Sequence, residues 1–224
     1  MILNEIAMIG ADTSRTLFYI EELIKHNLKP NHIVLLINEN DDLLPGQNTN
    51  ELSSKIINIL DSEKISYEIS PNHNINSKEV IDILERRNEP TFIFSGFGGV
   101  LLKNDVLSIS KNFLHVHGGY LPDYKGSTTN YFSLLAENMI GASSILLTKD
   151  IDCGPVLVRK KFLAPTDRTK IDHIYDSKAR AEVLVETLQR YLKLGFFDFE
   201  LKENTGGETF YVIHPVLKHL AILG

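Results

Sequence analysis

The sequence predicts an α/β fold, with a mostly parallel central sheet and helices on both faces. Short apolar runs recur along the first half of the chain, as is typical of strands buried on both sides. Each run is followed by a segment in which apolar residues return at helical spacing. Because this alternation of strand and helix needs crossover connections, it indicates a parallel sheet.

The first half of the chain contains the predicted strands of this sheet and the helices between them. A strand over 6–10 runs into turn and N-cap residues at 11–14, which begin a helix. The polar segment 38–50 holds Pro45, Gly46 and clustered asparagine and aspartate residues, so we expect a loop there. The other strands are expected over 32–37, 65–69 and 91–94, and the other helices over 52–60 and 77–86.

The second half changes to hairpin-like connections. One strand carries two histidines and ends at His117, and a long amphipathic helix over 170–192 closes the fold. The buried stripe of this helix is expected to hold Ile174, Ala181, Leu184, Val185, Leu188 and Leu192. Shorter helices are expected over 103–109 and 129–136, and further strands over 142–147 and 156–162. The tail is too short for an independent domain, so we expect one domain over 1–195 with an extension, 196–224, packed on it.

Composition and charge limit the classes of protein. The chain has 224 residues, a formal net charge of -6 and a pI near 5.8, so it lacks the basic footprint of a nucleic-acid-binding protein. Its single cysteine, Cys153, excludes an internal disulfide. The sequence shows no apolar run of membrane-spanning length and no signal-like N-terminus. We expect a cytoplasmic protein with no nucleic-acid and no membrane partner.

Two histidines at the end of a strand are the strongest sign of chemistry. His115 and His117 lie two residues apart, so in a β-strand they project from the same face. A glycine-rich turn follows them, and Asp150 and Asp152 come later in an acidic turn. A carboxylate beside an imidazole fixes its tautomer and raises its basicity. This arrangement predicts acid/base chemistry and therefore an enzyme.

Two other interpretations of these residues stay open. Histidines that face inward can be satisfied by backbone carbonyls, and aspartates are common in turns such as the one before Gly154. Alternatively, His115, His117 and Asp152 are ligand types that zinc or iron accepts, which would suit a metal-dependent hydrolase. A further ligand is not obvious in the sequence, so we assign no metal site.

Two glycine-containing turns follow predicted strands at the edge of the sheet where α/β folds bind ligands. In the first, Gly10, Asp12, Thr13 and Ser14 either offer backbone N–H groups to a phosphate or only begin a helix. The second turn holds Phe97, Gly98, Gly99, Val100 and Leu101. Its glycines would let the backbone approach a flat ligand, whereas a tight turn with Phe97 in the core is the structural alternative.

In order and spacing, these segments resemble the folate-dependent formyltransferase family. The catalytic motif of that family is Asn-x-His-x-Ser-x-Leu-Pro, followed by a basic residue and glycine and later by Asp-x-Gly. This chain reads His115-Val-His117-Gly-Gly119-Tyr-Leu-Pro-Asp-Tyr-Lys125-Gly, and later Asp152-Cys-Gly. It departs from the motif in having His115 where the family has asparagine, and Gly119 where the family has serine.

The resemblance implies a Rossmann-like formyltransferase fold and the transfer of a formyl group from N10-formyltetrahydrofolate to a primary amine. By motif position, His117 is the general acid/base and Asp152 is its orienting partner. An amine that attacks a formyl carbon creates an oxyanion, which needs a hydrogen-bond donor. His115 stands where the family uses the asparagine amide as that donor, and an imidazole N–H can also donate.

The resemblance also implies binding residues. The folate is expected against Phe97, Gly98, Gly99, Val100, Leu101 and Asp150. The amine substrate is expected against Gly10, Asp12, Thr13, Ser14, Gly119, Tyr120 and Lys125. Three outcomes of the exchange at position 115 stay open: an active transferase, a formyltetrahydrofolate hydrolase, or a binding protein without turnover.

The class of amine acceptor is narrowed only by resemblance to known kinds of formyltransferase. Methionyl-tRNA formyltransferases carry an additional C-terminal domain that helps hold tRNA, for which this chain is too short and too acidic. Glycinamide ribonucleotide formyltransferases have a Gly-x-Gly-Ser-Asn phosphate loop, from which residues 10–14 depart, and this activity stays an alternative with less support. The form that the motif takes at 121–129, Leu-Pro-x-Tyr-Lys-Gly-Ser-Thr-Thr, resembles that of bacterial formyltransferases of sugar pathways. The tail sequence Tyr-Val-Ile-His-Pro resembles the same enzymes. We expect a small-molecule amine acceptor, an amino sugar or its nucleotide conjugate, and the sequence is compatible with a homodimer.

Overall fold

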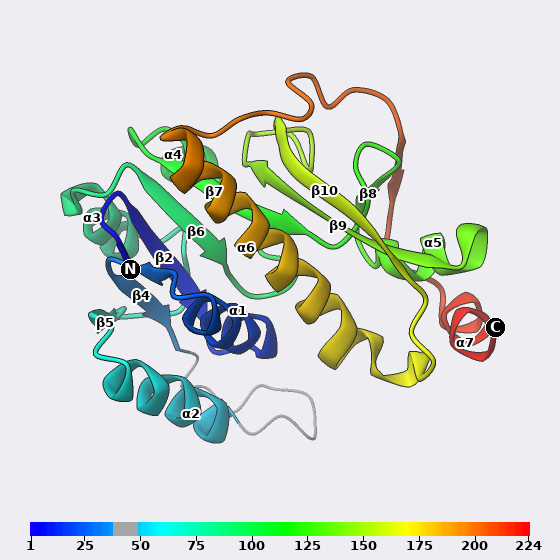
Figure 1. The fold of residues 1–224 in the computed structure, drawn as a ribbon, viewed down its shortest axis with the longest axis horizontal. Helices are drawn as coiled ribbons and strands as arrows, with labels where there is room; N and C mark the ends of the chain where they lie inside the picture. The colour runs from blue at the N-terminus through cyan, green and yellow to red at the C-terminus, as the bar shows by residue number, and fades with distance from the viewer. Residues whose placement is uncertain (38–48) are drawn as a thin grey trace. The chain divides into compact units, whose positions relative to one another are not determined.

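The structure, a computed structural model, describes residues 1–37 and 49–224 (Figure 1). These residues form two compact units, Met1–Phe113 and Leu114–Gly224. Residues 38–48 of the predicted loop lie outside the described residues, and the last two positions of that loop already belong to a helix. Among the described helices, none is both long enough and apolar enough to cross a membrane.

Four parallel strands in the order β6-β2-β4-β5 organise the first unit. Its strands are β1 (Ile2–Leu3), β2 (Ile6–Ala11), β3 (Lys29–Pro30), β4 (Ile33–Leu36), β5 (Tyr67–Ile69) and β6 (Thr91–Ser95). Its helices are α1 (Ser14–Lys25), α2 (Thr49–Ser62), α3 (Lys78–Arg86) and α4 (Asn104–Leu107). The predicted strands and helices of this half are present, with shifts of at most three residues at their ends.

Burial and capping explain the elements of the first unit. Every residue of β2 and β4 is buried, which is why both strands are continuous apolar runs. The Thr13 side chain accepts from the N–H of Thr16 and caps α1, and Ser77 caps α3 in the same manner. Helices α1 and α2 contact each other, whereas α3 lies on the other side of the sheet in Figure 1, as right-handed crossovers require. The predicted α/β fold is confirmed.

An antiparallel sheet in the order β10-β9-β7 organises the second unit. Its strands are β7 (Asn112–His117), whose first two residues belong to the first unit, β8 (Tyr124–Gly126), β9 (Met139–Leu146), β10 (Val156–Leu163) and β11 (Glu208–Phe210). Its helices are α5 (Thr129–Glu137), α6 (Asp176–Leu194) and α7 (Pro215–Leu223). Strand β11 pairs in parallel with β8, so part of the tail lies beside the loop that follows His117.

The long helix begins later than its amphipathic pattern predicts. A 3-10 turn (Arg168–Lys170) and a π-helical turn (Ile171–Tyr175) precede α6, so the apolar residues before 176 do not share its phase. Ile174 is consequently only half-buried, and Leu192, in the last turn, is 38% exposed, so both are wrongly predicted members of the buried stripe. The other four predicted members, Ala181, Leu184, Val185 and Leu188, are buried.

Candidate active site

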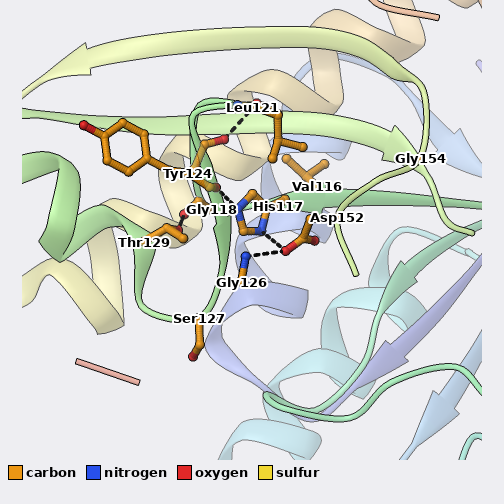
Figure 2. Close-up of polar contacts among 12 residues, drawn as sticks. Val116, His117, Gly118, Leu121, Tyr124, Gly126, Ser127, Thr129, Asp152 and Gly154 are labelled. Carbon is orange, nitrogen blue, oxygen red and sulfur yellow. Dashed lines mark hydrogen bonds and ion pairs between the residues drawn. The ribbon is translucent and has the colours of Figure 1, made fainter. Parts of the chain in front are cut away.

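Both histidines lie on strand β7, and His117 is the last residue of that strand. Its register against β9 pairs His117 with Ser143 and His115 with Ile145. His117 is 5% exposed, whereas His115 is half-buried. Figure 2 shows the imidazole of His117 between the loop at Tyr124 and the carboxylate of Asp152. The structure therefore brings together the two residues that the motif predicts as the catalytic pair.

Each ring nitrogen of His117 faces an oxygen atom. Nε2 lies 2.7 Å from the backbone oxygen of Tyr124, and Nδ1 lies 3.4 Å from Oδ2 of Asp152. Because a carbonyl oxygen can only accept, Nε2 must carry a proton and donate it. The lone pair of the neutral ring is then on Nδ1, which makes Nδ1 the basic atom. A proton taken up by Nδ1 is held beside the Asp152 carboxylate.

Burial determines the charge state of His117. Removal of the ring from water lowers the pKa of His117, the Asp152 carboxylate raises it, and the Arg180 guanidinium lowers it further. The result is a pKa below the ordinary value of 6.5. At neutral pH the imidazole is uncharged and can accept a proton, as a general base must.

The turn after β9 distinguishes the two candidate aspartates. Asp152 is 9% exposed and adopts the left-handed region, with a φ of 53°. Its Oδ2 accepts a hydrogen bond of 2.8 Å from the backbone N–H of Gly126, which fixes the carboxylate toward His117. Asp150 is an exposed turn residue whose carbonyl accepts from the N–H of Cys153. The carboxylate that faces the imidazole is therefore that of Asp152.

The two glycines after His117 lie in close packing. A Cβ atom at Gly119 would lie 2.6 Å from His117 Nε2 and 2.6 Å from the Tyr124 carbonyl oxygen. A Cβ atom at Gly118 would lie 2.3 Å from the Asp176 carboxylate and 2.4 Å from the Arg180 guanidinium. Interiors packed this densely have no space for an added methyl group. The glycine at position 119, where the family has serine, thus suits the loop of this chain.

Gly119→Ala should lower the free energy of unfolding by about 1–3 kcal/mol, because the methyl group overpacks the loop around His117. Chemical denaturation measures the change. Gly98→Ala is the matched control, since a Cβ atom there meets nothing within 4 Å. Equal stability losses in the two variants would contradict the close packing of Gly119.

A polar pocket of about 150 Å³ lies beside His117 in the second unit. Its wall includes the side chains of Asp172, Asp176 and Arg180. This volume is small beside the ~300–1,000 Å³ that is typical of ligand pockets. Burial and the Asp172 carboxylate raise the pKa of Tyr131, which also lines the pocket, and so keep its hydroxyl protonated as a donor.

Residues of α5 and α6 that the motif does not include support this pocket. Arg180 donates from Nε to Asp176 at 2.7 Å and from a terminal nitrogen to the carbonyl of Val116 at 2.9 Å. Asn130 donates to the other carboxylate oxygen of Asp176 at 2.9 Å. The four-residue spacing of Asp176 and Arg180 on one helix is the signal that predicts such an ion pair.

His115 does not join the catalytic pair in a metal site. Among residues 1–37 and 49–224, no group of three or more histidine, cysteine, aspartate and glutamate side chains is placed to hold a metal ion. His115 lies on the same strand as His117 but is not gathered with Asp152 as a ligand set. The geometry therefore gives no support to the metal-dependent hydrolase.

The first glycine-containing turn forms a capped helix start. Gly10 and Asp12 are buried, Thr13 is the N-cap of α1, and Ser14 is the first helical residue. A Cβ atom at Gly10 would lie 2.7 Å from the Thr16 side chain, so packing alone requires a glycine there. The contact of these residues with an amine substrate stays a prediction.

The second turn presents exposed apolar groups and backbone. Val100 and Leu101 are 38% and 57% exposed, and a Cβ atom at Gly98 or Gly99 would meet nothing within 4 Å. Phe97 is half-buried and packs edge-on against His73 at 6.0 Å between ring centroids, so it is not the core residue of the structural alternative. The open backbone and apolar side chains fit the flat, partly apolar ligand that the resemblance predicts.

The two other predicted substrate residues, Tyr120 and Lys125, have protein partners. The Arg159 guanidinium lies 4.7 Å and the Lys161 ammonium 4.9 Å from the ring centre of Tyr120. Lys125 is buried, and its ammonium donates to the backbone oxygen of Asn204 at 2.9 Å. Their contact with substrate stays a prediction, and the structure additionally connects Lys125 to the tail.

The buried imidazole–carboxylate pair on an α/β fold is an arrangement suited to acid/base chemistry. Residues 4–188 match the family model described as formyl transferase, so the chain belongs to the formyl transferase family. Members of this family are enzymes that use N10-formyltetrahydrofolate as formyl donor.

The matches include methionyl-tRNA formyltransferases, sugar N-formyltransferases and a phosphoribosylglycinamide formyltransferase. The methionyl-tRNA formyltransferase of Finegoldia magna is 28% identical over 205 residues, which cover 90% of this chain and 63% of that enzyme. A sugar N-formyltransferase from a Shewanella species matches with a TM-score of 0.63 at 13% identity, over 97% of this chain and 86% of that one. The Helicobacter canadensis N-formyltransferase, solved with folinic acid and dTDP-3-aminofucose, matches with a TM-score of 0.59 at 17% identity, over 94% and 71%. The structural matches confirm the Rossmann-like formyltransferase fold.

Proposed function

We propose that the protein transfers a formyl group from N10-formyltetrahydrofolate to the primary amine of a small metabolite, an amino sugar or its nucleotide conjugate. The observation that carries the proposal is the buried imidazole of His117, which faces the Asp152 carboxylate at the wall of a small polar pocket. We propose a sugar amine as acceptor because the structure matches that of an N-formyltransferase solved with dTDP-3-aminofucose. The same fold also serves glycinamide ribonucleotide formyltransferase, solved from Anaplasma phagocytophilum, so that acceptor enters the test.

The chain's own groups supply the proton transfers of this reaction. A bond forms between the amine nitrogen and the formyl carbon, while the bond between that carbon and N10 of the folate breaks. His117 Nδ1 takes the proton that the amine loses, and the Asp152 carboxylate stabilises the resulting imidazolium. The ring then returns the proton to the departing N10, which restores the neutral imidazole.

Other residues would bind and orient the two substrates. The exposed backbone and apolar side chains at 97–101 would hold the folate, because nothing in their own unit fills the space around Gly98 and Gly99. The carboxylates of Asp172 and Asp176 would accept hydrogen bonds from the neutral amine at the pocket wall. His115 would donate to the oxyanion that develops on the formyl oxygen.

The test is a folate-release assay that follows tetrahydrofolate formed from N10-formyltetrahydrofolate. The panel of acceptors contains amino-sugar nucleotides, glycinamide ribonucleotide and methionyl-tRNA, together with a reaction that has no amine. Release that depends on an amino-sugar nucleotide is the expected result. Release without any amine would indicate hydrolysis, and release only with one of the other two acceptors would overturn the sugar assignment. No release from donor-bound protein with any of them would overturn the proposal itself.

His115→Asn should retain activity, because it restores the amide that the family uses as oxyanion donor. The measurement is kcat with the acceptor that the release assay identifies. His115→Ala is the matched variant, and it should lose about 100-fold or more, as expected when one oxyanion donor is removed. Full activity of the alanine variant would show that position 115 does not stabilise the oxyanion.

A further inference from the structure

The tail returns to the catalytic loop. Backbone hydrogen bonds join Leu201 to Val156 in both directions, at 2.8 and 3.0 Å. Further along, β11 pairs with β8, the strand that supplies the Tyr124 carbonyl facing His117 and the Gly126 N–H facing Asp152. The tail therefore flanks both segments that orient the catalytic pair.

Asn204 lies between these two anchors and connects three segments. It is 4% exposed, and its side-chain nitrogen donates to the carbonyl of Asp152 at 2.5 Å and to that of Gly154 at 3.1 Å. The backbone carbonyl of Asn204 accepts a hydrogen bond of 2.9 Å from the buried ammonium of Lys125. One residue thus connects the tail to the turn that holds Asp152 and to the strand that follows the His117 loop.

The orientation of the Asn204 amide is fixed by its neighbours. Two carbonyl oxygens face one end of the amide, and because carbonyls only accept, that end must be the NH₂ group. The other end, Oδ1, is buried and has no hydrogen-bond partner among the described residues. A buried acceptor without a partner lowers the stability of the folded protein. The two hydrogen bonds that the NH₂ group donates offset this loss.

The backbone of Asp152 explains why this support matters. Its φ of 53° lies in the left-handed region, which is uncommon for non-glycine residues, although aspartate adopts it more readily than most. The carbonyl of that same residue is the one that Asn204 holds, while its carboxylate faces His117. Losing the Asn204 bonds would let the turn relax and the carboxylate move away from the imidazole.

We propose that Asn204 is a positioning residue, which holds the Asp152 turn so that the carboxylate stays beside Nδ1 of His117. This inference rests on the proposed formyl transfer for its kinetic consequence but not for its geometric one. A displacement of about 1 Å at a catalytic group can cost 100-fold in rate. The expected loss of kcat in Asn204→Ala is therefore between about tenfold and 100-fold, with a smaller change in the KM of the acceptor.

A double-mutant cycle separates positioning from general loss of structure. Asn204→Ala is made in the wild-type protein and in Asp152→Ala, with Thr205→Ala, an exposed neighbour, as the matched control. If Asn204 acts through the Asp152 carboxylate, its loss should cost little more once that carboxylate is absent. An equal fold-loss of kcat in both backgrounds would overturn the proposal.

A second measurement does not depend on turnover. NMR titration of the His117 ring in Asn204→Ala should show its midpoint moved to lower pH, because Asp152 is the carboxylate that raises the pKa of the ring. The other charged groups that act on the ring, Arg180 and Asp176, are unchanged in this variant, as is the Asp172 carboxylate in the pocket wall. An unchanged midpoint in a folded variant would overturn the positioning role. An inactive wild-type protein with a shifted midpoint would instead overturn only the formyl transfer.

Discussion

His117→Ala should lower kcat for formyl transfer by about two orders of magnitude or more, because it removes the group that takes and returns the proton. His117→Gln is the companion variant, since it is closer in size and cannot titrate. Single-turnover and steady-state rates with the identified acceptor measure the loss, and circular dichroism confirms the fold. His219→Ala, at an exposed position in α7, is the control and should keep wild-type rates. Near-normal turnover of either His117 variant would refute the assignment of the general base.

His117 should also make the free energy of unfolding depend on pH. Burial lowers the pKa of His117, so below about pH 6.5 the unfolded chain binds a proton at this ring that the native protein does not. Stability must then fall as the pH falls from about 6.5 to the lower native pKa. His117→Gln should remove this part of the slope, which denaturation measured at several pH values can detect.

Asp152→Asn should lower kcat by about 100-fold or more while the loop keeps its shape. The amide oxygen can still accept from the N–H of Gly126, but the negative charge beside His117 Nδ1 is lost. Without that charge the pKa of His117 falls further, because Asp152 is what raises it. The acid limb of the kcat/KM profile should therefore move to lower pH.

Asp198→Asn is the matched control for this variant, because it removes the same charge from an exposed position of the second unit. It should keep both the rate and the profile of the wild-type protein. An acid limb that stays in place in Asp152→Asn would mean that another group titrates in the reaction.

The elements of the fold were predictable where burial imposes a pattern. Strands such as Ile33–Leu36 are buried on both faces, so their apolar runs are visible in the sequence. The start of α6 was not predictable, because the π-helical turn at Ile171–Tyr175 changes the helical phase without any glycine or proline to mark it. Strand β11 was also missed, since three residues at a largely exposed position carry no apolar alternation.

The proximity of His117 and Asp152 was predictable from the order of the motif, and the structure brings the two side chains together, whereas their catalytic role stays a prediction. Spacing alone could not separate Asp150 from Asp152, because the choice depends on the left-handed backbone of Asp152 and on the N–H of Gly126. Asn204 could not be found at all, since its partners at Lys125 and Asp152 lie 79 and 52 residues away. Such contacts follow from the folded chain and not from a local pattern.

The return of the tail to the catalytic loop has a consequence for synthesis. The Lys125–Asn204 hydrogen bond spans 79 residues, which take roughly 4–16 s to translate at 5–20 residues per second. During that interval the ribosome-bound chain contains His117 but lacks both strand β11 and the side chain of Asn204. Closing so long a loop also has a cost in chain entropy, although this cost grows only slowly with length. The hydrogen bond that connects Asn204 to Lys125 can therefore form only after residue 204 has been synthesised.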